Sequence, residues 1–380
     1  ATEPVYDCII VGGGISGLAA AWKLRKLGYD NILLLEKDDP VGGFSRMDGG
    51  DPTFYARAAA YSVFPYNEDL IEIYQDLGML RAVDDAGVPT IDDKFVLKAP
   101  VNSVFVNGTW YGDAWEAGMD GLPLAPKMLA DLKAFRADML VWYDYVGSDE
   151  KMAFDSPSDA STTDAAVRAL DGVSLAEYIA SKGWDRAVAD FFDPYCRSAF
   201  GTTVDKVSAW SALNFLGSEF GVCMSQPGGN GYLSKMLADK VGATRIRTSA
   251  FVVRVKSEGA EVLVSYKQGT SPSATLAPDA MTTLVVKTVI YAAPRFIAPY
   301  LLPDLVAGGR PEGGGFEYTP YVVANIHISK TPPGLGYDNW VPTGSAFFTD
   351  FIVADWPGLA NPSAAPETRP NVLTVYCPML

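Results

Sequence analysis

The stretch that decides the fold runs from Tyr6 to Met47 and reads YDCIIVGGGISGLAAAWKLRKLGYDNILLLEKDDPVGGFSRM. Its first residues, Tyr6 to Val11, form a short apolar run that predicts a buried strand. A glycine cluster and a helical pattern follow, and Gly28 can end the helix because glycine accepts the left-handed conformation after a last turn. Ile32 to Leu35 predicts a second buried strand.

Three glycines lie between the first strand and the helix. Gly12, Gly14 and Gly17 form the pattern G-x-G-x-x-G. The first allows a tight turn, the second lets the backbone approach a pyrophosphate, and the third lets the helix pack on the strand. The pyrophosphate would lie at the helix N-terminus, where the amides of residues such as Ile15 and Ser16 favour an anion.

A carboxylate follows the second strand, and its spacing from the glycine motif is typical of a ribose-binding acid. Glu36 lies 19 residues after Gly17, where an acid accepts hydrogen bonds from ribose hydroxyls, and Lys37 comes next. Strand, helix and acid together predict a dinucleotide site. The motif alone leaves the choice between NAD and FAD open.

The residues after Pro40 narrow that choice. The run VGGFSRM resembles the glycine doublet of the flavin amine oxidase superfamily, which includes monoamine oxidases, phytoene desaturases and protoporphyrinogen oxidases. The resemblance implies FAD as the cofactor and an FAD-dependent oxidoreductase as the activity. It also implies that this part of the chain wraps the diphosphate and approaches the flavin, through Gly42, Gly43, Phe44, Ser45 and Arg46. Arg46 is then a phosphate partner; the alternative is a surface arginine.

Weaker resemblances add further candidates. Small residues followed by an aromatic, Ala59, Ala60 and Tyr61, match the segment that passes the isoalloxazine ring in the family, although a plain apolar turn explains them too. Val252 lies where the family's strand clamps the adenine, and the alternative is an ordinary core residue. Ala293 lies in a strand end, YAAP, that resembles the end of the family's core sheet.

The predicted fold class is α/β, with two interleaved domains. A Rossmann-like FAD-binding domain is expected over residues 1–90 and 225–300, and an α+β substrate domain over 91–224 and 301–380. Inside the second region, Asn107-Gly108 predicts a hairpin, and Ser174 with Glu177 predicts a helix capping box.

One departure from the family bears on the chemistry. Monoamine oxidases carry a lysine in the strand that corresponds to YVVANIHIS, whereas Ala324 or Asn325 stands there in this chain. This departure weakens the expectation of amine oxidation by the familiar route, and no catalytic residue is assigned. Hydride removal from a C–N or C–H bond is the first hypothesis. The rivals are a desaturase or isomerase acting on an apolar substrate, and a flavoprotein subunit that passes electrons within a complex.

Composition excludes several classes of function. The chain has 380 residues and a net charge of −15, which argues against nucleic acid because phosphate binding needs clustered lysine and arginine. One histidine excludes a multi-histidine metal site, and no metal is predicted. Four cysteines without C-x-x-C spacing leave free thiols or one disulfide open. No apolar run approaches the ~20 residues of a transmembrane helix.

The ends of the chain raise two further expectations. Family members continue with a Gly-Asp segment that reaches the flavin, and none follows Tyr376. We therefore expect either a second polypeptide that completes the flavin domain, as in a hetero-oligomer, or a truncated chain. The first residue is Ala1, which leaves an exported, leader-processed protein and a cytoplasmic protein both open.

Overall fold

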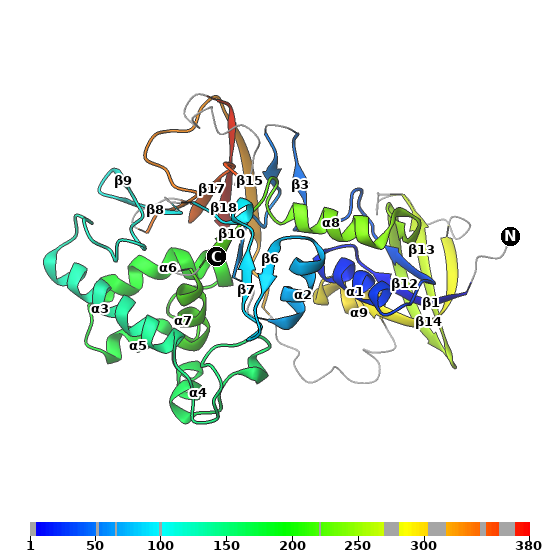
Figure 1. Ribbon diagram of the computed structural model, residues 1–380, viewed down its shortest axis with the longest axis horizontal. Helices are drawn as coiled ribbons and strands as arrows, with labels where there is room; N and C mark the ends of the chain where they lie inside the picture. Colours follow the sequence, from blue (N-terminus) through cyan, green and yellow to red (C-terminus); the bar gives the residue numbers. More distant parts are fainter. Residues whose placement is uncertain are drawn as a thin grey trace. The chain divides into compact units, whose positions relative to one another are not determined.

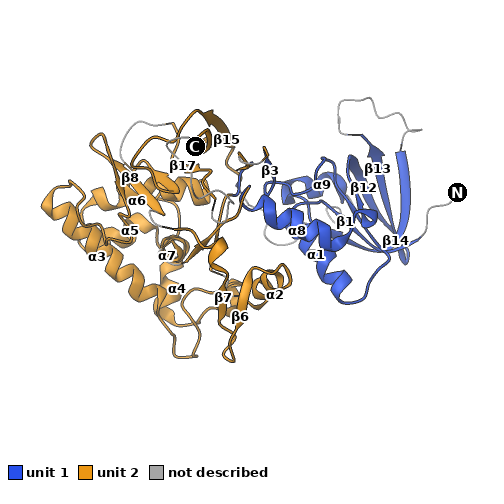
Figure 2. Ribbon diagram, turned by 45° about the horizontal axis from the view of Figure 1, so that its top comes forward, with its two compact units in different colours: residues 1–48, 56–59, 228–317 blue, residues 49–55, 60–227, 318–380 orange. Residues whose placement is uncertain are grey.

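The computed structural model divides the chain into two compact units, which are coloured in Figure 2. Unit 1 comprises residues 1–48, 56–59 and 228–317, and unit 2 comprises residues 49–55, 60–227 and 318–380. The residues that the structure describes are 5–50, 53–64, 67–98, 101–219, 222–269, 281–302, 317–342, 347–356 and 369–380.

Unit 1 is built on a six-stranded sheet with the order β11-β2-β1-β14-β13-β12. The four strands from β11 to β14 are parallel, and β13 and β12 add an antiparallel extension. Its elements are β1 (Tyr6–Val11), α1 (Ile15–Lys26), β2 (Ile32–Leu35), β3 (Met47–Asp48), α8 (Gly231–Val241), β11 (Ile246–Arg247), β12 (Ala250–Glu258), β13 (Glu261–Gln268), β14 (Met281–Tyr291) and α9 (Ala298–Leu301). The short strand β4 (Tyr55–Ala56) lies where the chain passes between the units.

Three parallel strands of unit 1 end at the same level. Val11 of β1 is in register with Leu35 of β2 and with Tyr291 of β14. The residues that follow these strands therefore meet at one edge of the sheet, which is where open α/β sheets bind their ligands. Beneath this edge the core is aliphatic, and Ile9 and Leu34 are fully buried.

Unit 2 combines a helical cluster with a second six-stranded sheet of order β15-β18-β17-β16-β8-β9. Figure 1 shows α3, α5, α6 and α7 side by side, and their shared core is rich in aromatic residues. The elements are β5 (Ser62–Val63), α2 (Glu68–Asp76), β6 (Leu80–Val83), β7 (Pro89–Ile91), β8 (Asn102–Val106), β9 (Thr109–Gly112), α3 (Pro126–Tyr143), α4 (Ala165–Asp171), α5 (Leu175–Ser181), α6 (Arg186–Phe200), α7 (Ala209–Ser218), β10 (Cys223–Met224), β15 (Tyr321–Ile328), β16 (Asp338–Trp340), β17 (Asp350–Val353) and β18 (Asn371–Pro378).

Several local predictions are confirmed. The first two strands have the predicted bounds, and Gly28 follows α1 with φ +89°. Asn107 and Gly108 both have positive φ in the turn between β8 and β9. The Ser174 hydroxyl accepts from the Glu177 amide while the Glu177 carboxylate accepts from the Ser174 amide, so the capping box is present.

The compact units divide the chain differently from the predicted domains. Residues 60–90 group with unit 2, and unit 1 continues to residue 317 instead of 300. The predicted division is by cofactor and substrate role, whereas the observed one is by packing. The assignment of those roles to the residue ranges stays a prediction.

Candidate cofactor site and buried acid cluster

The glycine turn after β1 is packed tightly against its neighbours. Gly12 has φ +107°, and a Cβ there would lie 2.8 Å from the Ala292 carbonyl oxygen. A Cβ on Gly17 would lie only 1.9 Å from the Gly12 carbonyl oxygen, so α1 packs directly on the turn. Gly14 differs, because a Cβ there would have no neighbour within 4 Å among the described residues. The middle glycine thus borders open space.

The N-terminus of α1 opens onto that space. Gly14 is the N-cap residue and provides no side-chain cap, and the first turn holds no acidic residue. Ile15 and Ser16 are exposed, whereas Gly17 is buried against the turn. Amides at a helix N-terminus without a capping side chain favour an anion.

The glycine doublet lies directly on the first turn. The Gly42 amide donates to the Gly13 carbonyl over 2.7 Å, and a Cβ on Gly43 would lie 3.2 Å from the Gly14 Cα. Ser45 is buried next to the doublet, while Phe44 is 80% exposed. The structure therefore brings two predicted glycine segments together around Gly14.

Arg46 is a buried cation with weak local compensation. Its side chain is 10% exposed, and its Nε has no hydrogen-bond partner among the described atoms. The carboxylate of Asp38 lies 3.8 Å from its Nη1. A buried guanidinium with this environment favours a further anion, so Arg46 is not a surface arginine, and the phosphate role remains its predicted one.

Glu36, which directly follows β2, stabilises the glycine turn. Its carboxylate accepts from the Gly13 amide at 2.6 Å and from the Asp38 amide at 2.8 Å. Each carboxylate oxygen can accept a second hydrogen bond, so the predicted ribose contact is compatible with this arrangement. Lys37 is exposed and pairs with Asp38 at 2.7 Å.

The remaining candidates of unit 1 lie at the same sheet edge or in the core. Ala59 donates to the Phe44 carbonyl and accepts from Asn230, and Ala293 follows β14 beside Gly12. Val252 is buried in the core of unit 1, next to a β-bulge between Val252 and Arg254. A bulge leaves one residue out of the ladder, and the adenine role of Val252 stays a prediction.

These residues fit a flavin adenine dinucleotide. The turn leaves space at Gly14 where a Cβ would point, an uncapped helix N-terminus borders it, and Arg46 lacks a strong anionic partner. An ADP diphosphate would satisfy both the helix amides and the guanidinium.

The last two candidates, Ala60 and Tyr61, belong to unit 2. The Ala60 carbonyl accepts from the Ser225 and Tyr337 hydroxyls. Tyr61 is half-buried, and its hydroxyl oxygen lies 3.1 Å from both carboxylate oxygens of Glu219 and 3.3 Å from Asp338. Tyr61 thus joins two acids that sequence reasoning did not identify.

The sheet of unit 2 places more polar groups around this tyrosine. Asn102 is in register with Asp338 on neighbouring parallel strands, and Asp350 is in register with Trp340 on antiparallel ones. Register partners and residues two apart in one strand share a face, so these four residues lie on one side of the sheet. All four are at most 3% exposed. The opposite face is apolar and contributes Phe351 and other residues to a small core.

The pKa values of these acids are raised. Burial raises the pKa of Glu219 to about 7 and that of Asp350 to about 7. Burial, followed by the neighbouring carboxylates of Asp350 and Glu219, holds the pKa of Asp338 well above its usual range. No ion pair formed by the described part of the chain involves any of the three. We call Glu219, Asp338, Asp350 and Tyr61 the acid cluster.

A signal for these acids exists in the sequence. Asp350 opens the apolar run DFIV, and Asp338 precedes Asn339 and Trp340 in a short strand. Burying an acid costs free energy unless a partner compensates it. An acid inside an otherwise buried strand therefore indicates a functional position. Asn325, one of the two residues predicted to stand where the family carries its lysine, lies on the same face and accepts from the Thr374 hydroxyl at 2.8 Å.

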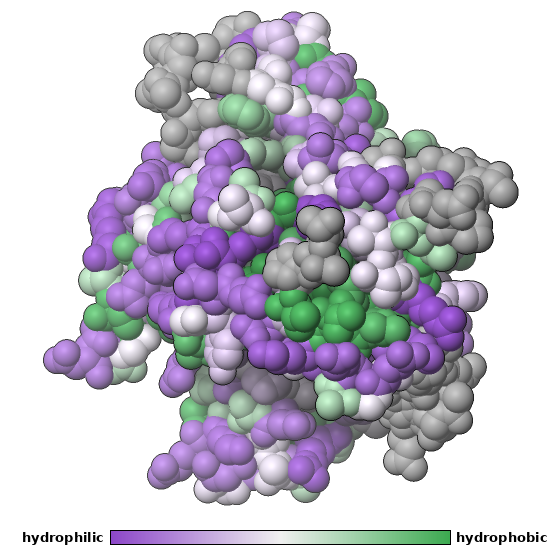
Figure 3. All heavy atoms as spheres, turned by 90° about the vertical axis from the view of Figure 1, so that its right-hand side faces the viewer, coloured by the Kyte–Doolittle hydropathy of each residue, from purple (hydrophilic) through white to green (hydrophobic). Residues whose placement is uncertain are grey.

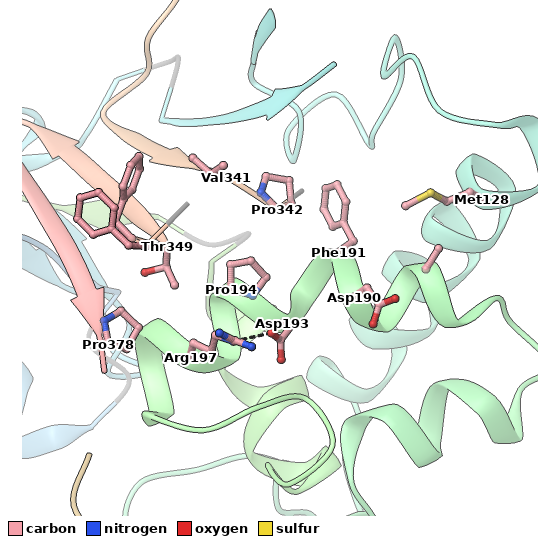
Figure 4. A pocket seen from close by; sticks show the side chains of 13 residues that line it. Met128, Asp190, Phe191, Asp193, Pro194, Arg197, Val341, Pro342, Thr349 and Pro378 are labelled. Atoms are coloured by element: carbon pink, nitrogen blue, oxygen red, sulfur yellow. Dashed lines mark hydrogen bonds and ion pairs between the residues drawn. The ribbon is translucent and has the colours of Figure 1, made fainter. Parts of the chain in front are cut away.

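A hollow of about 560 Å³ lies next to α6 in unit 2 (Figure 4). Arg197 and Asp193 form an ion pair of 2.6 Å at its base, and Phe191 and Pro194 line its wall. Thr349 also lines it and donates to the Asp350 carboxylate over 2.5 Å. One hydroxyl therefore separates this hollow from the acid cluster.

Other site classes find no support in the described residues. No group of three histidine, cysteine or acidic residues there could hold a metal ion, and all four cysteines are free and buried. Among the described helices, none is long and apolar enough to cross a membrane. On the face drawn in Figure 3, hydrophilic residues border a compact hydrophobic area near the centre.

Comparison with known proteins gives matches over most of the chain. The family model described as flavin containing amine oxidoreductase matches residues 15–377. The oxidoreductase PigB of Serratia sp. is 23% identical over 369 residues, which cover 87% of this chain and 53% of PigB. A flavin-containing amine oxidase A of Sus scrofa is 33% identical over 75 residues, 20% of this chain and 14% of that protein. The chain thus spans about half the length of PigB.

Solved structures share the fold. A wild-type putrescine oxidase bound to putrescine has a TM-score of 0.64 at 17% identity, and the match covers 99% of this chain and 76% of that one. A fatty acid isomerase from P. acnes has a TM-score of 0.62 at 16% identity, covering 100% and 78%. At these identities the likeness concerns the fold alone.

Proposed function

The chain belongs to the flavin-containing amine oxidoreductase family, and on this premise we propose that it is an FAD-dependent oxidoreductase that oxidises the C–N bond of an amine substrate, which binds as a cation and loses a proton from nitrogen and a hydride from the adjacent carbon. FAD, the cofactor of this family, supplies the hydride acceptor when it is bound. In the proposal, the turn at Gly14, the N-terminus of α1 and Arg46 hold the diphosphate. The acid cluster of unit 2 holds the substrate.

One observation carries the choice of a cationic substrate. Glu219, Asp338 and Asp350 are at most 5% exposed and lie without a positive partner among the described ion pairs. Buried carboxylates without a cation are costly, and an ammonium group compensates them. Tyr61, which contacts two of them, follows Ala59 of the predicted flavin segment by only two residues.

The alternative is a desaturase or isomerase that acts on an apolar substrate. Ala324 or Asn325 in place of the family's lysine and the likeness to a fatty acid isomerase favour it. Against it, the aromatic residues of the helical region form a closed core, in which Trp115, Phe135 and Phe192 are at most 1% exposed. Those three side chains are packed inside the helical cluster, so none of them is exposed to an apolar substrate.

Two further expectations remain proposals. A second polypeptide that completes the flavin domain, or a role as an electron-passing subunit, has no supporting observation in either unit. Export after removal of a leader stays equally open beside a cytoplasmic location.

Anaerobic flavin reduction tests the proposed function. FAD-loaded protein is mixed with n-butylamine, benzylamine and 1,4-diaminobutane in one set, and with an unsaturated fatty acid in another. We expect at least one amine to bleach the visible absorption of the oxidised flavin after anaerobic mixing. Conversion of the fatty acid to an isomer or a more unsaturated product, with no amine-dependent bleaching, would favour the alternative. Protein that binds no FAD would contradict both.

A further inference from the structure

The distances around Tyr61 indicate that at least one carboxyl group of the acid cluster is protonated. A phenol has one hydrogen to donate, yet the Tyr61 oxygen lies within 3.3 Å of two different carboxyl groups, Glu219 and Asp338. If the hydroxyl donates to one carboxylate, the second contact is favourable only when the other carboxyl is protonated and donates to the Tyr61 oxygen. The geometry therefore requires a proton on Glu219 or Asp338.

The placement of both acids favours the protonated form. Glu219 is the C-cap residue of α7, where the helix dipole disfavours a negative charge. Asp338 is 2% exposed and carries Asp350 and Glu219 as charged neighbours, which raise its pKa further beyond the effect of burial. Two like charges in one buried site are not both ionised without a cation.

A second observation points to a ligand beside these acids. Asn102 is 1% exposed, and neither its amide oxygen nor its amide nitrogen has a partner among the described atoms. It lies next to Asp338 in the sheet register, and the Oδ1 atom of Asp338 also lacks a partner. On the same face, the Trp340 Nε1 is unpartnered as well, while its ring stacks on Tyr195 at 3.8 Å. Buried polar atoms are nearly always bonded, so this group of atoms fits a polar ligand.

We propose that the acid cluster binds an ammonium group of the substrate and releases one proton to solvent as it does so. An ammonium group has three donors, which suit Asp338 Oδ1 and the Asn102 oxygen. In the exchange, the proton shared through Tyr61 leaves for bulk water, and the entering cation compensates the carboxylate that remains. No bond to carbon changes, and the charge of the site is the same before and after.

This inference rests on the proposed function, since it concerns the substrate of that activity. It predicts that affinity for the cation rises about tenfold per pH unit while the cluster is protonated and levels off above its pKa. The other titratable groups facing the cluster are Tyr195, Tyr337, Tyr376, Cys223 and Glu116, with Tyr321 beyond Asp350. Burial raises the pKa of each tyrosine and of the Cys223 thiol, so these groups stay neutral between pH 5 and 8, and burial also raises the pKa of Glu116.

Calorimetry of the FAD-loaded protein counts the proton directly. n-Butylammonium chloride is titrated at pH 6.5 in two buffers of different ionisation enthalpy, with 1-butanol as the neutral probe. We expect release of about one proton per ammonium ion bound and none for the alcohol. Asp338→Asn and Glu219→Gln should each reduce the release to below half, whereas Asp93→Asn, at an exposed position, should not change it. Ammonium binding without proton release would overturn the inference, and so would failure of n-butylammonium to bind.

Infrared spectroscopy without ligand tests the shared proton in the wild-type protein, so the test does not depend on a variant that folds. At pH 6.5, the infrared carbonyl band of a protonated carboxyl group should be present in the wild type and diminished in Glu219→Gln. Absence of the band in the wild type would overturn the shared proton. If amines reduce the flavin but no proton is released on binding, the proposed function survives and this inference fails. If a proton is released but no amine reduces the flavin, only the proposed function fails.

Discussion

At the scale of single residues, two glycines of one motif have different physical reasons to be glycine. Gly17 has no room for a side chain, because the Gly12 carbonyl oxygen would lie 1.9 Å from its Cβ. Gly14 has room in the protein itself, since no described atom lies within 4 Å of its Cβ position. A ligand in that space, as the motif predicts, would explain why the second position is glycine too. The motif predicts both causes from sequence, approach to a pyrophosphate at Gly14 and close packing at Gly17, and the structure shows the packing directly.

Alanine at each of these glycines should separate folding from cofactor binding. We expect Gly17→Ala to lower the free energy of unfolding by about 2–3 kcal/mol, because the backbone must shift around the added methyl group. Gly14→Ala should change the stability of the apoprotein by less than about 1 kcal/mol and should lower FAD affinity at least tenfold. Urea unfolding of the apoprotein and retention of flavin absorbance after gel filtration measure the two effects.

A matched control is available at Gly50, which has no neighbour within 4 Å among described atoms and lies outside the glycine turn. Gly50→Ala should leave both stability and FAD affinity close to wild type. Equal FAD affinity in Gly14→Ala and Gly50→Ala would contradict the placement of the diphosphate at Gly14.

Arg46 provides a second prediction at this scale. Its guanidinium is buried, with an unpartnered Nε and a carboxylate no closer than 3.8 Å. Removing a poorly compensated buried charge is often neutral or stabilising, so Arg46→Met should keep or raise the stability of the apoprotein. The same change should weaken FAD binding by roughly tenfold to a hundredfold, the usual effect of a lost charge-assisted hydrogen bond. Flavin titration by fluorescence measures this, with Arg57→Met, an exposed arginine of unit 1 at 49% exposure, as the control.

At the scale of elements, the strands could be predicted more easily than their partners. Runs such as YVVANIHIS and VLTVY identified β15 and β18 with nearly correct bounds. The pairing of β8 with β16 could not be read, because it joins segments far apart in the chain. That pairing places Asn102 beside Asp338, so local patterns could mark Asp338 as an unusual acid in a buried strand but could not show what lies next to it. The glycine turn was visible because its parts are close in sequence.

The polar face of this sheet should make stability depend on pH in an unusual direction. The pKa values of Glu219 and Asp350 are raised to about 7 by burial, above the ordinary values of 4.5 and 3.8. Between about pH 4.5 and pH 7 the folded state therefore holds protons that the unfolded state has lost, and the free energy of unfolding falls as pH rises. For a carboxyl shifted from 4.5 to about 7, this loss is on the order of 3 kcal/mol.

Denaturant unfolding at pH 5, 6, 7 and 8 measures this dependence. Glu219→Gln keeps the size of the side chain but cannot titrate, so its free energy of unfolding should fall less steeply than that of the wild type. Parallel curves for the two proteins would show that Glu219 titrates normally in the folded state.

Helix α5 offers a prediction from a feature that was read correctly from sequence. The Ser174 hydroxyl accepts from the Glu177 amide, and the Glu177 carboxylate accepts from the Ser174 amide at 2.8 Å. Ser174→Ala should lower the free energy of unfolding by about 1 kcal/mol. Glu177→Gln should cost less, because glutamine also completes a capping box. Thermal unfolding of the two variants compares them, and equal losses would show that the charge of Glu177 contributes as much as the Ser174 hydroxyl.

At the scale of the whole molecule, each unit is assembled from three separate segments of the chain. The predicted interleaving of two domains followed from the return of the strand and helix pattern after residue 225. The boundaries between the units could not be predicted from sequence, because the chain passes from unit 1 to unit 2 just before Tyr61, inside a short continuous run. Packing alone decides those positions. Because the glycine turn belongs to unit 1, we expect cofactor binding to slow amide exchange in unit 1.

Hydrogen exchange of the apoprotein with ADP or FAD tests this at the level of the whole chain. ADP should slow exchange of the amides over residues 14–17, because N–H groups at the start of α1 would bond the diphosphate, whereas the Gly12 and Gly13 amides already donate to Leu35 and Glu36. FAD should protect the same amides and also residues 42–46 and 59, which the family resemblance places toward the flavin. At a ligand concentration of 100 times Kd, mass action adds about 2.7 kcal/mol to the bound state, so exchange that requires release of the ligand should slow about a hundredfold. Strands β16 to β18 of unit 2 serve as the internal reference, and ADP should leave them unchanged. Protection by FAD elsewhere, without protection of residues 14–17 by either ligand, would show that the nucleotide lies away from the glycine turn.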